Sequence, residues 1–130
     1  MTVGRDSGDM TTIPASTIDT DALRRAYASR SVEDLLALYA EDATVEIVDA
    51  VHMPSHPHRL TGREALRAHF EGVFARDMSH EADIVVATPS ALGFSLRCTY
   101  ADGTKVVCAS TAVVRDGLIV REVGVQAWDS

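Results

Sequence analysis

Two residues with acid–base side chains, Asp49 and His69, stand where the hydrophobic pattern turns them inward. Asp49 follows Ile47 by two residues in a β-branched segment, and alternate residues of a strand share one face. His69 lies between Leu66 and Phe70 in a segment with helical apolar spacing. An aspartate in an apolar cavity has a raised pKa, as a general base at neutral pH requires. We therefore expect a carboxylate–imidazole pair at the mouth of a pocket.

Each of these positions also has a structural interpretation. Asp49 could be a turn residue that ends its strand, and His69 could be a core or rim histidine bonded to the backbone. Tyr27 lies one helical turn after Leu23 on the same face, so its hydroxyl could donate to an oxyanion in the pocket. The alternative is a packed helix tyrosine with its hydroxyl at the surface. The predicted catalytic set is Asp49, His69 and Tyr27.

Three histidines, His52, His56 and His58, are crowded into the proline-containing segment 49–60. Neutral imidazole is the commonest zinc ligand, but this spacing fits no established zinc motif. The prolines favour an extended, exposed chain. We therefore expect no metal and no other cofactor. We place His52 among the ligand-contacting residues, in a loop over the pocket, with plain solvent exposure of these histidines as the alternative.

Cys98 and Cys108 flank a turn around Gly103, so symmetric strand pairing places them on one face together with Ser110 and could make them direct cross-strand neighbours. Two cysteines are too few for a disulfide scaffold. A nucleophilic thiol needs an activating base, which the sequence does not place. We interpret the two cysteines as small residues that pack beneath the pocket.

Glu122 and Gln126 alternate with valines along the last predicted strand. If their face is inward, they are polar groups of the pocket. If it is outward, they belong to a surface on which two copies of the chain could pair. The sequence pattern leaves both alternatives open.

Composition bounds the kinds of partner. The chain has 130 residues, 46% of them apolar, and a formal net charge of -7. These values are typical of one globular domain, here 17–130, after an arm at 1–16 that we expect to be disordered. The acidic balance argues against nucleic acid and anionic membranes as partners. No apolar run resembles a signal peptide or a membrane span, so we expect a cytoplasmic location.

The periodicity changes from helical to alternating along the chain. Helices are predicted at about 20–29, from Ser31 into 39–43, and after Thr61, with Ser31–Asp34 and Thr61–Glu64 as capping boxes. Strands are predicted at 44–48, 80–87, 92–100, 105–115 and 118–128. Three helices followed by an antiparallel meander predict an α+β fold, with helices on one face of a curved sheet and a pocket at its open end.

Three short runs carry a family resemblance: LYAEDATVE at 38–46, GREAL at 62–66 and DGLI at 116–119. They resemble SnoaL-like polyketide cyclases and ketosteroid isomerases of the nuclear-transport-factor-2-like superfamily, over residues 18–129. The resemblance implies a cone-shaped curved antiparallel sheet with three helices that enclose a pocket. It also implies a homodimer through the sheet as one arrangement.

The isomerase pattern is broken at three positions. Where the resemblance implies two oxyanion donors and a proton-transfer base, this chain has Leu23, Ser110 and Ile47 respectively. An aliphatic side chain transfers no proton, so we expect no steroid isomerisation by that mechanism. Tyr39 matches a structural tyrosine of the family's pocket.

The predicted function is that of a cofactor-free acid–base enzyme, a cyclase, isomerase or dehydratase, acting on a small, largely apolar carbonyl or polyketide-like compound. The alternative is a non-catalytic module of the same fold that binds a small ligand or assists assembly. The residues expected to bind the ligand are Tyr39, Ile47, His52, Phe70, Phe94, Cys98, Cys108 and Ser110.

Overall fold

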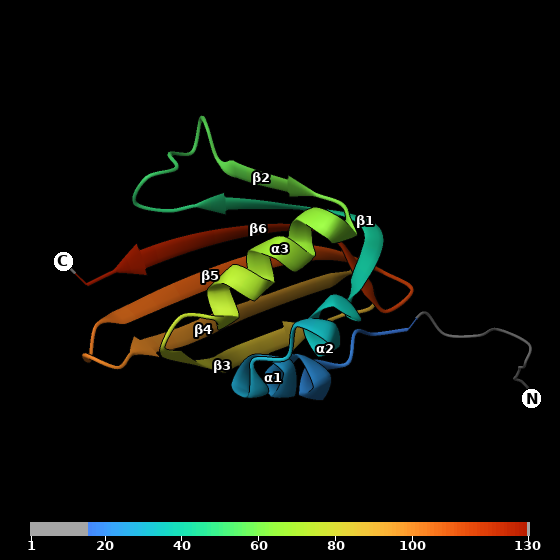
Figure 1. Cartoon of the computed structure of the whole chain (residues 1–130). Helices are drawn as coiled ribbons and strands as arrows, with labels where there is room; N and C mark the ends of the chain where they lie inside the picture. The colour runs from blue at the N-terminus through green and yellow to red at the C-terminus, as the bar shows by residue number, and fades with distance from the viewer. Residues whose placement is uncertain (1–15, 130) are drawn as a thin grey trace, which may run out of the picture.

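The computed structural model describes residues 16–129, so the predicted arm at 1–16 lies outside the described residues apart from Ser16. Within this range six strands form one sheet, in the order β2-β1-β6-β5-β4-β3, and three helices accompany it (Figure 1). The elements are α1 (Thr20–Ser29), α2 (Val32–Leu36), β1 (Tyr39–Val48), β2 (His58–Thr61), α3 (Arg63–Phe74), β3 (Met78–Ala87), β4 (Ala91–Tyr100), β5 (Lys105–Arg115) and β6 (Leu118–Trp128).

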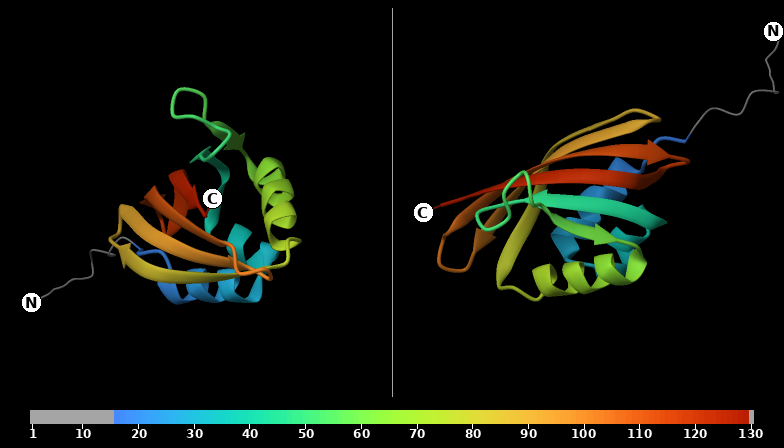
Figure 2. Two further views of the ribbon diagram at one scale, coloured as in Figure 1. Left: turned by 90° about the vertical axis from the view of Figure 1, so that its left-hand side faces the viewer. Right: turned by 90° about the horizontal axis from the view of Figure 1, so that it is seen from above.

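The sheet curves around the side that the helices cover (Figure 2). Helix α1 packs against β3, and α3 contacts β1 and β2 at the opposite edge of the sheet. Helix α2 joins the two because it contacts both α1 and α3. The predicted α+β fold is confirmed, and the concave side of the sheet is left to hold a cavity.

Local signals explain where the first two helices begin. The side chain of Asp19 accepts a hydrogen bond of 2.9 Å from the backbone N–H of Ala22, and Ser31 caps α2 in the same way through Asp34. Helix α1 ends at Ser29, and Arg30 caps its C-terminus in the left-handed conformation with φ of 54°. The buried face of α1 includes Tyr27, which is thereby held over the concave side of the sheet.

The structure corrects the predicted boundaries in the middle of the chain. Helix α2 ends at Leu36, and Tyr39 begins β1, so Tyr39 reaches the core from a strand. The expected Thr61–Glu64 capping box is not formed. Thr61 belongs to β2, where it pairs with Thr44 of β1, and Gly62 caps α3 without a side-chain hydrogen bond. The segment predicted as a loop at 49–60 thus ends in a strand.

One strand pair departs from the antiparallel pattern. Strands β1 and β6 pair in parallel, whereas each other neighbouring pair in the sheet is antiparallel. A hairpin joins strands of opposite direction, but β1 and β6 are connected through most of the chain, so no turn dictates their direction. The fold class stands, with this one correction to the sheet.

The hydrophobic core lies between α1, α3 and the concave face of the sheet. The six residues predicted to be substantially buried all are: Leu23, Leu36, Phe70, Phe74, Phe94 and Leu96. The Phe70 side chain is 6% exposed and its ring contacts those of Tyr39, His69 and Phe74. Phe70 therefore fixes α3 over the sheet.

Replacing Phe70 by alanine should lower the free energy of unfolding by about 3–5 kcal/mol, since a buried aromatic leaves both lost contacts and a cavity. Chemical denaturation measures this change. Val51→Ala is the matched control, because Val51 is 81% exposed and its truncation should change stability by less than about 0.5 kcal/mol. Equal effects of the two substitutions would contradict the position of α3.

Candidate active site

A cavity of about 90 Å³ lies between α1, α3 and the concave face of the sheet. Apolar side chains make up most of its wall, and an outer basin of about 500 Å³ adjoins it and shares His69, Arg76 and Trp128 as lining residues. The polar or reactive groups on the inner wall include Tyr27, Tyr39, His80, Cys98, Cys108, Ser110 and Glu122. A mostly apolar concavity with a few converging polar groups is the usual form of a small-molecule site.

Among the acidic and basic residues (Asp, Glu, Lys and Arg) that line this cavity, Glu122 is the most buried, with 6% of the residue exposed. The hydroxyl of Tyr39 donates a hydrogen bond of 2.5 Å to Glu122 Oε1, and Ser110 lines the same part of the cavity. Burial raises the pKa of Glu122, although the hydroxyls of Tyr39 and Ser110 oppose the rise. Glu122 and Gln126 both line the cavity. Of the two orientations that the sequence left open for their strand, the inward one is therefore correct.

Tyr27 and Tyr39 are both buried and line the same cavity, with their hydroxyls close enough to affect each other's pKa. Burial, followed by the nearby Glu122 carboxyl, raises the pKa of both phenols well above the ordinary value. Both therefore remain protonated at neutral pH and are available as hydrogen-bond donors. Tyr27 occupies the inward position expected of it, and its hydroxyl is not at the surface.

The absence of a side chain at Gly124 leaves space for the Ser110 hydroxyl. The two residues are direct partners across β5 and β6, and a Cβ at position 124 would lie 3.0 Å from Ser110 Oγ. A larger residue at 124 would crowd the Ser110 hydroxyl beside Glu122. Glycine at this position thus allows the carboxyl and the hydroxyl to share the cavity floor.

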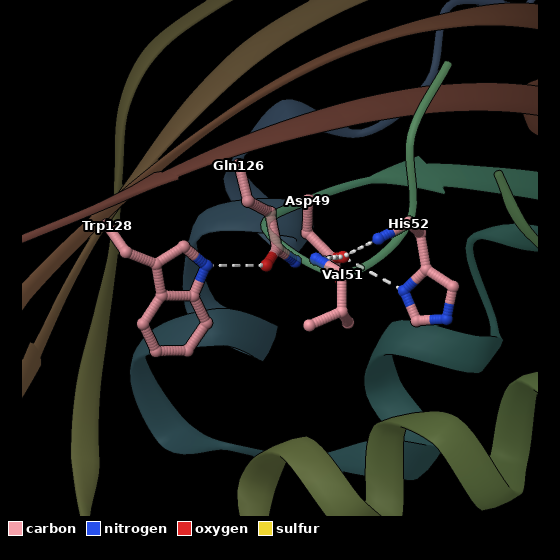
Figure 3. Close-up of polar contacts among 5 residues, drawn as sticks. All are labelled: Asp49, Val51, His52, Gln126 and Trp128. Atoms are coloured by element: carbon pink, nitrogen blue, oxygen red, sulfur yellow. Dashed lines mark hydrogen bonds and ion pairs between the residues drawn. The ribbon is translucent and has the colours of Figure 1, made fainter. Parts of the chain in front are cut away.

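The expected Asp49–His69 pair is not formed. The Asp49 carboxylate instead accepts hydrogen bonds from the backbone N–H groups of Val51 and His52 and lies 2.9 Å from His52 Nδ1 (Figure 3). These bonds lower the pKa of Asp49 against the opposing effect of burial, which is the reverse of the predicted shift. Asp49 organises its own loop at the edge of the outer basin, and Gln126 and Trp128 contact each other beside it.

His69 lies at the junction of the inner cavity and the outer basin. Its ring is 6.0 Å from that of His58 and 5.5 Å from that of Phe70. Burial, with smaller effects from His58 and Arg76, lowers the pKa of His69 to about 4. His69 is therefore an uncharged ring at neutral pH.

Cys98 and Cys108 both line the cavity, as expected, but they are not direct cross-strand partners. Cys98 pairs with Val106 and Cys108 with Leu96, so the two thiols are diagonal neighbours. Sequence reasoning missed His80, whose Nδ1 lies 3.3 Å from Cys98 Sγ. One sequence signal for it existed, because His80 has the same parity as Ala82 in the predicted strand. The structure shows in addition that His80 is the direct partner of Cys98.

Most of the residues expected to bind a ligand surround one space. Tyr39, Ile47, Phe70, Cys98, Cys108 and Ser110 line the inner cavity, and His52 lines the outer basin. Phe94 lies behind the wall, with its ring 6.1 Å from that of Tyr27. Among residues 16–129, no three His, Cys, Asp or Glu side chains are placed to hold a metal ion, and no helix in that range is long and apolar enough to cross a bilayer.

Comparison with known proteins agrees with this geometry. The sequence profile of the SnoaL-like domain matches residues 20–122. The chain belongs to the SnoaL-like family. No curated protein matches the SnoaL-like chain at a significant level.

Solved structures share the fold of this SnoaL-like protein. A candidate ketosteroid isomerase from Kribbella flavida aligns with a TM-score of 0.68 and 22% identity, over 85% of this chain and 75% of that one. IdmH, a candidate polyketide cyclase from Streptomyces antibioticus, gives 0.61 and 22% over 82% and 88%. A computationally designed 17-OHP binder gives 0.63 and 23% over 85% and 90%. At these identities the likeness establishes the fold alone.

The stability of Glu122→Gln relative to the wild type should rise as the pH increases above 4.5. Below that pH the carboxyl is neutral in the folded and unfolded states, so the difference is constant. Above it the unfolded wild type releases the proton while the folded state retains it, and wild-type stability falls against the variant by about 1.4 kcal/mol per pH unit until the folded pKa is reached.

Urea denaturation of both proteins from about pH 4.5 to about pH 7.5 measures this difference. Glu81→Gln on the exposed side of β3 removes the same formal charge and is the control. A difference for Glu122→Gln that stays flat over this range, or a slope of equal size for Glu81→Gln, would contradict the raised pKa.

Proposed function

We propose that this SnoaL-like protein is a cofactor-free acid–base enzyme that moves a proton at the carbon next to a carbonyl group. Its substrate is a small, largely apolar compound such as a polyketide intermediate, and the outcome is cyclisation, isomerisation or dehydration. The observation that carries the proposal is Glu122, a carboxyl buried beside the Tyr39 hydroxyl in an otherwise mostly apolar cavity. A general base works best when its pKa is raised toward the operating pH, and the burial of Glu122 acts in that direction.

Each polar group has a role in this reaction. Glu122 accepts the proton from the carbon and returns it. The Tyr39 hydroxyl donates to Oε1 of that carboxyl, and the neighbouring Tyr27 hydroxyl donates to the carbonyl oxygen as negative charge develops there. Uncharged His69 contacts the substrate at the entrance, and Asp49 with His52 shapes the rim.

Two of the similar structures are consistent with such a ligand. One is a candidate polyketide cyclase and one is a designed 17-OHP binder, and both are built on this fold. Ile47 cannot transfer a proton, and in our proposal Glu122 on β6 takes that role. Glu122 thereby does the work of the isomerase residues that this sequence lacks.

The wild-type chain should catalyse exchange of the α-protons of small cyclic ketones, from cyclohexanone to 2-tetralone, with deuterium from heavy water. Glu122→Gln should reduce the rate above background by roughly 100-fold or more, because the amide cannot accept the proton. Proton NMR follows the exchange. Glu46→Gln on the outer β1–β2 pair, where Glu46 bonds to Arg59, is the control and should leave the rate unchanged.

Exchange that persists in Glu122→Gln would rule out Glu122 as the base. Binding of the ketones without exchange by the wild type would favour the second candidate function, a non-catalytic binding or assembly module. The observation that favours this alternative is the loss of the isomerase residues at Leu23, Ile47 and Ser110.

We also propose a homodimer through the sheet. The outward face carries exposed apolar side chains on three strands: Ile84, Val86, Val107, Val113 and Val125. Alternation along β5 and β6 places the last three opposite the cavity-lining residues. A second copy of the same face is the complement that such an apolar patch fits best.

Sedimentation velocity should therefore show a dimer for the wild type and a monomer for Val113→Asp with Val125→Asp, since two buried unpaired carboxylates would oppose pairing. Unchanged melting of the variant monomer is the control for folding. A wild-type chain that is monomeric at about 100 μM, a concentration at which any Kd in the usual micromolar range would give dimer, would refute this arrangement.

A further inference from the structure

The cavity contains a second reactive pair that the acid–base reaction does not use. Cys98 on β4 and His80 on β3 are direct partners across the sheet, and His80 Nδ1 lies 3.3 Å from Cys98 Sγ. Both residues line the cavity, and they are 4% and 5% exposed respectively. A thiol in hydrogen-bond contact with an imidazole is the arrangement from which a proton passes from sulfur to nitrogen.

The other ring nitrogen of His80 indicates that this histidine is not a satisfied core residue. His80 Nε2 is buried and has no hydrogen-bond partner among residues 16–129. The ring instead packs against Phe74, 5.3 Å away and nearly perpendicular, and against Tyr27 at 6.4 Å. Aromatic walls hold the imidazole in place, while its one side-chain partner in the described structure is the sulfur of Cys98.

The two cysteines of the cavity differ in character. The titratable groups that face them come from several elements: His80 on β3, Tyr27 on α1 and Glu122 on β6. The neighbouring Cys108 and the His80 ring lower the pKa of Cys98 to about 5. The pKa of Cys108 is raised, chiefly by Cys98, by burial and by the Glu122 carboxyl. Because the imidazole contacts Cys98, the thiolate resides there.

We propose that Cys98, activated by His80, is a nucleophile that adds to α,β-unsaturated carbonyl compounds in the cavity. The Cys98 proton passes to His80 Nδ1, and the sulfur electron pair forms a bond to the β-carbon. The π electrons of the carbon–carbon double bond move to give an enolate. The imidazolium returns its proton to the α-carbon, so the net change is addition of S–H across the double bond, with no oxidant or reductant. The reverse sequence releases the compound.

The chemistry of the cavity selects this class of compound. A thiolate is a soft nucleophile and prefers the polarised β-carbon, and the apolar wall favours a weakly hydrated organic acceptor. Stabilisation of the enolate oxygen by Tyr27 rests on the proposed function. The reactivity of the Cys98–His80 pair does not, because the proton passes between these two residues without Glu122 or Tyr27.

Competitive labelling of the full chain with N-ethylmaleimide, itself such an acceptor, tests the pair. Peptide mass spectrometry distinguishes Cys98 from Cys108. Exposure alone predicts faster labelling of Cys108, because Cys108 is partly exposed and Cys98 is buried. The pair predicts the reverse, with Cys98 labelled roughly tenfold faster or more at about pH 6, because only the thiolate reacts.

His80→Gln should slow labelling of Cys98 by roughly tenfold or more at that pH, because no base takes the thiol proton. His56→Gln in the exposed loop is the matched control, and Cys108→Ser should leave Cys98 reactive. The pH profile of the wild type needs no variant: labelling of Cys98 should persist from about pH 8 to about pH 6, while that of Cys108 falls about tenfold per unit.

Three results would overturn the proposal: faster labelling of Cys108, a His80→Gln rate equal to wild type, or a Cys98–Cys108 disulfide formed in air in place of the adduct. Labelling and proton exchange are independent readouts. Selective labelling without exchange would support the nucleophile and defeat the acid–base function, and exchange without labelling would do the opposite.

Discussion

The Glu122 carboxyl lies in a cavity where the Tyr39 hydroxyl donates a hydrogen bond to it and the Ser110 hydroxyl is a second polar neighbour. Neither hydroxyl carries a positive charge, so ionisation in this place must overcome the loss of water without a cationic partner from these two groups. Retaining such a group costs stability that an apolar residue would not cost. The carboxyl also affects its neighbours in the cavity. Its proximity contributes to the raised pKa of Tyr27 and Tyr39, so both tyrosines keep their protons.

Sheet topology brings these groups together. Tyr39, Ser110 and Glu122 come from β1, β5 and β6, which are neighbours in the sheet although β1 is distant in the chain from the other two. The parallel pairing of β1 with β6 and the register shift after Tyr39 let that side chain turn into the cavity at the point where Glu122 emerges. Helix α3 closes the space, since Phe70 packs on the Tyr39 ring.

Much of the fold follows from sequence pattern, but the site follows only in part. Alternation and helical spacing give the strands and helices because burial of one face is a local constraint. Which face of the sheet Glu122 lies on depends on which strands pair with β6 and in what register. Its position in the cavity could therefore not be predicted from the sequence alone. Asp49 was predicted to face His69, but a local turn competes for its carboxylate through the N–H groups of Val51 and His52. His80 begins a predicted strand, where parity is least secure.

The protonation state of Glu122 is the most direct test of this account. Carbon-13 NMR of the glutamate carboxyl groups, with Glu122 assigned by its loss in Glu122→Gln, follows each titration from about pH 3 to about pH 8 and gives the pKa as the midpoint. The account predicts that Glu122 retains the shift of a protonated carboxyl at pH values well above 4.5. A Glu122 signal that titrates at or below 4.5 would show that burial does not govern this group, and would contradict the account.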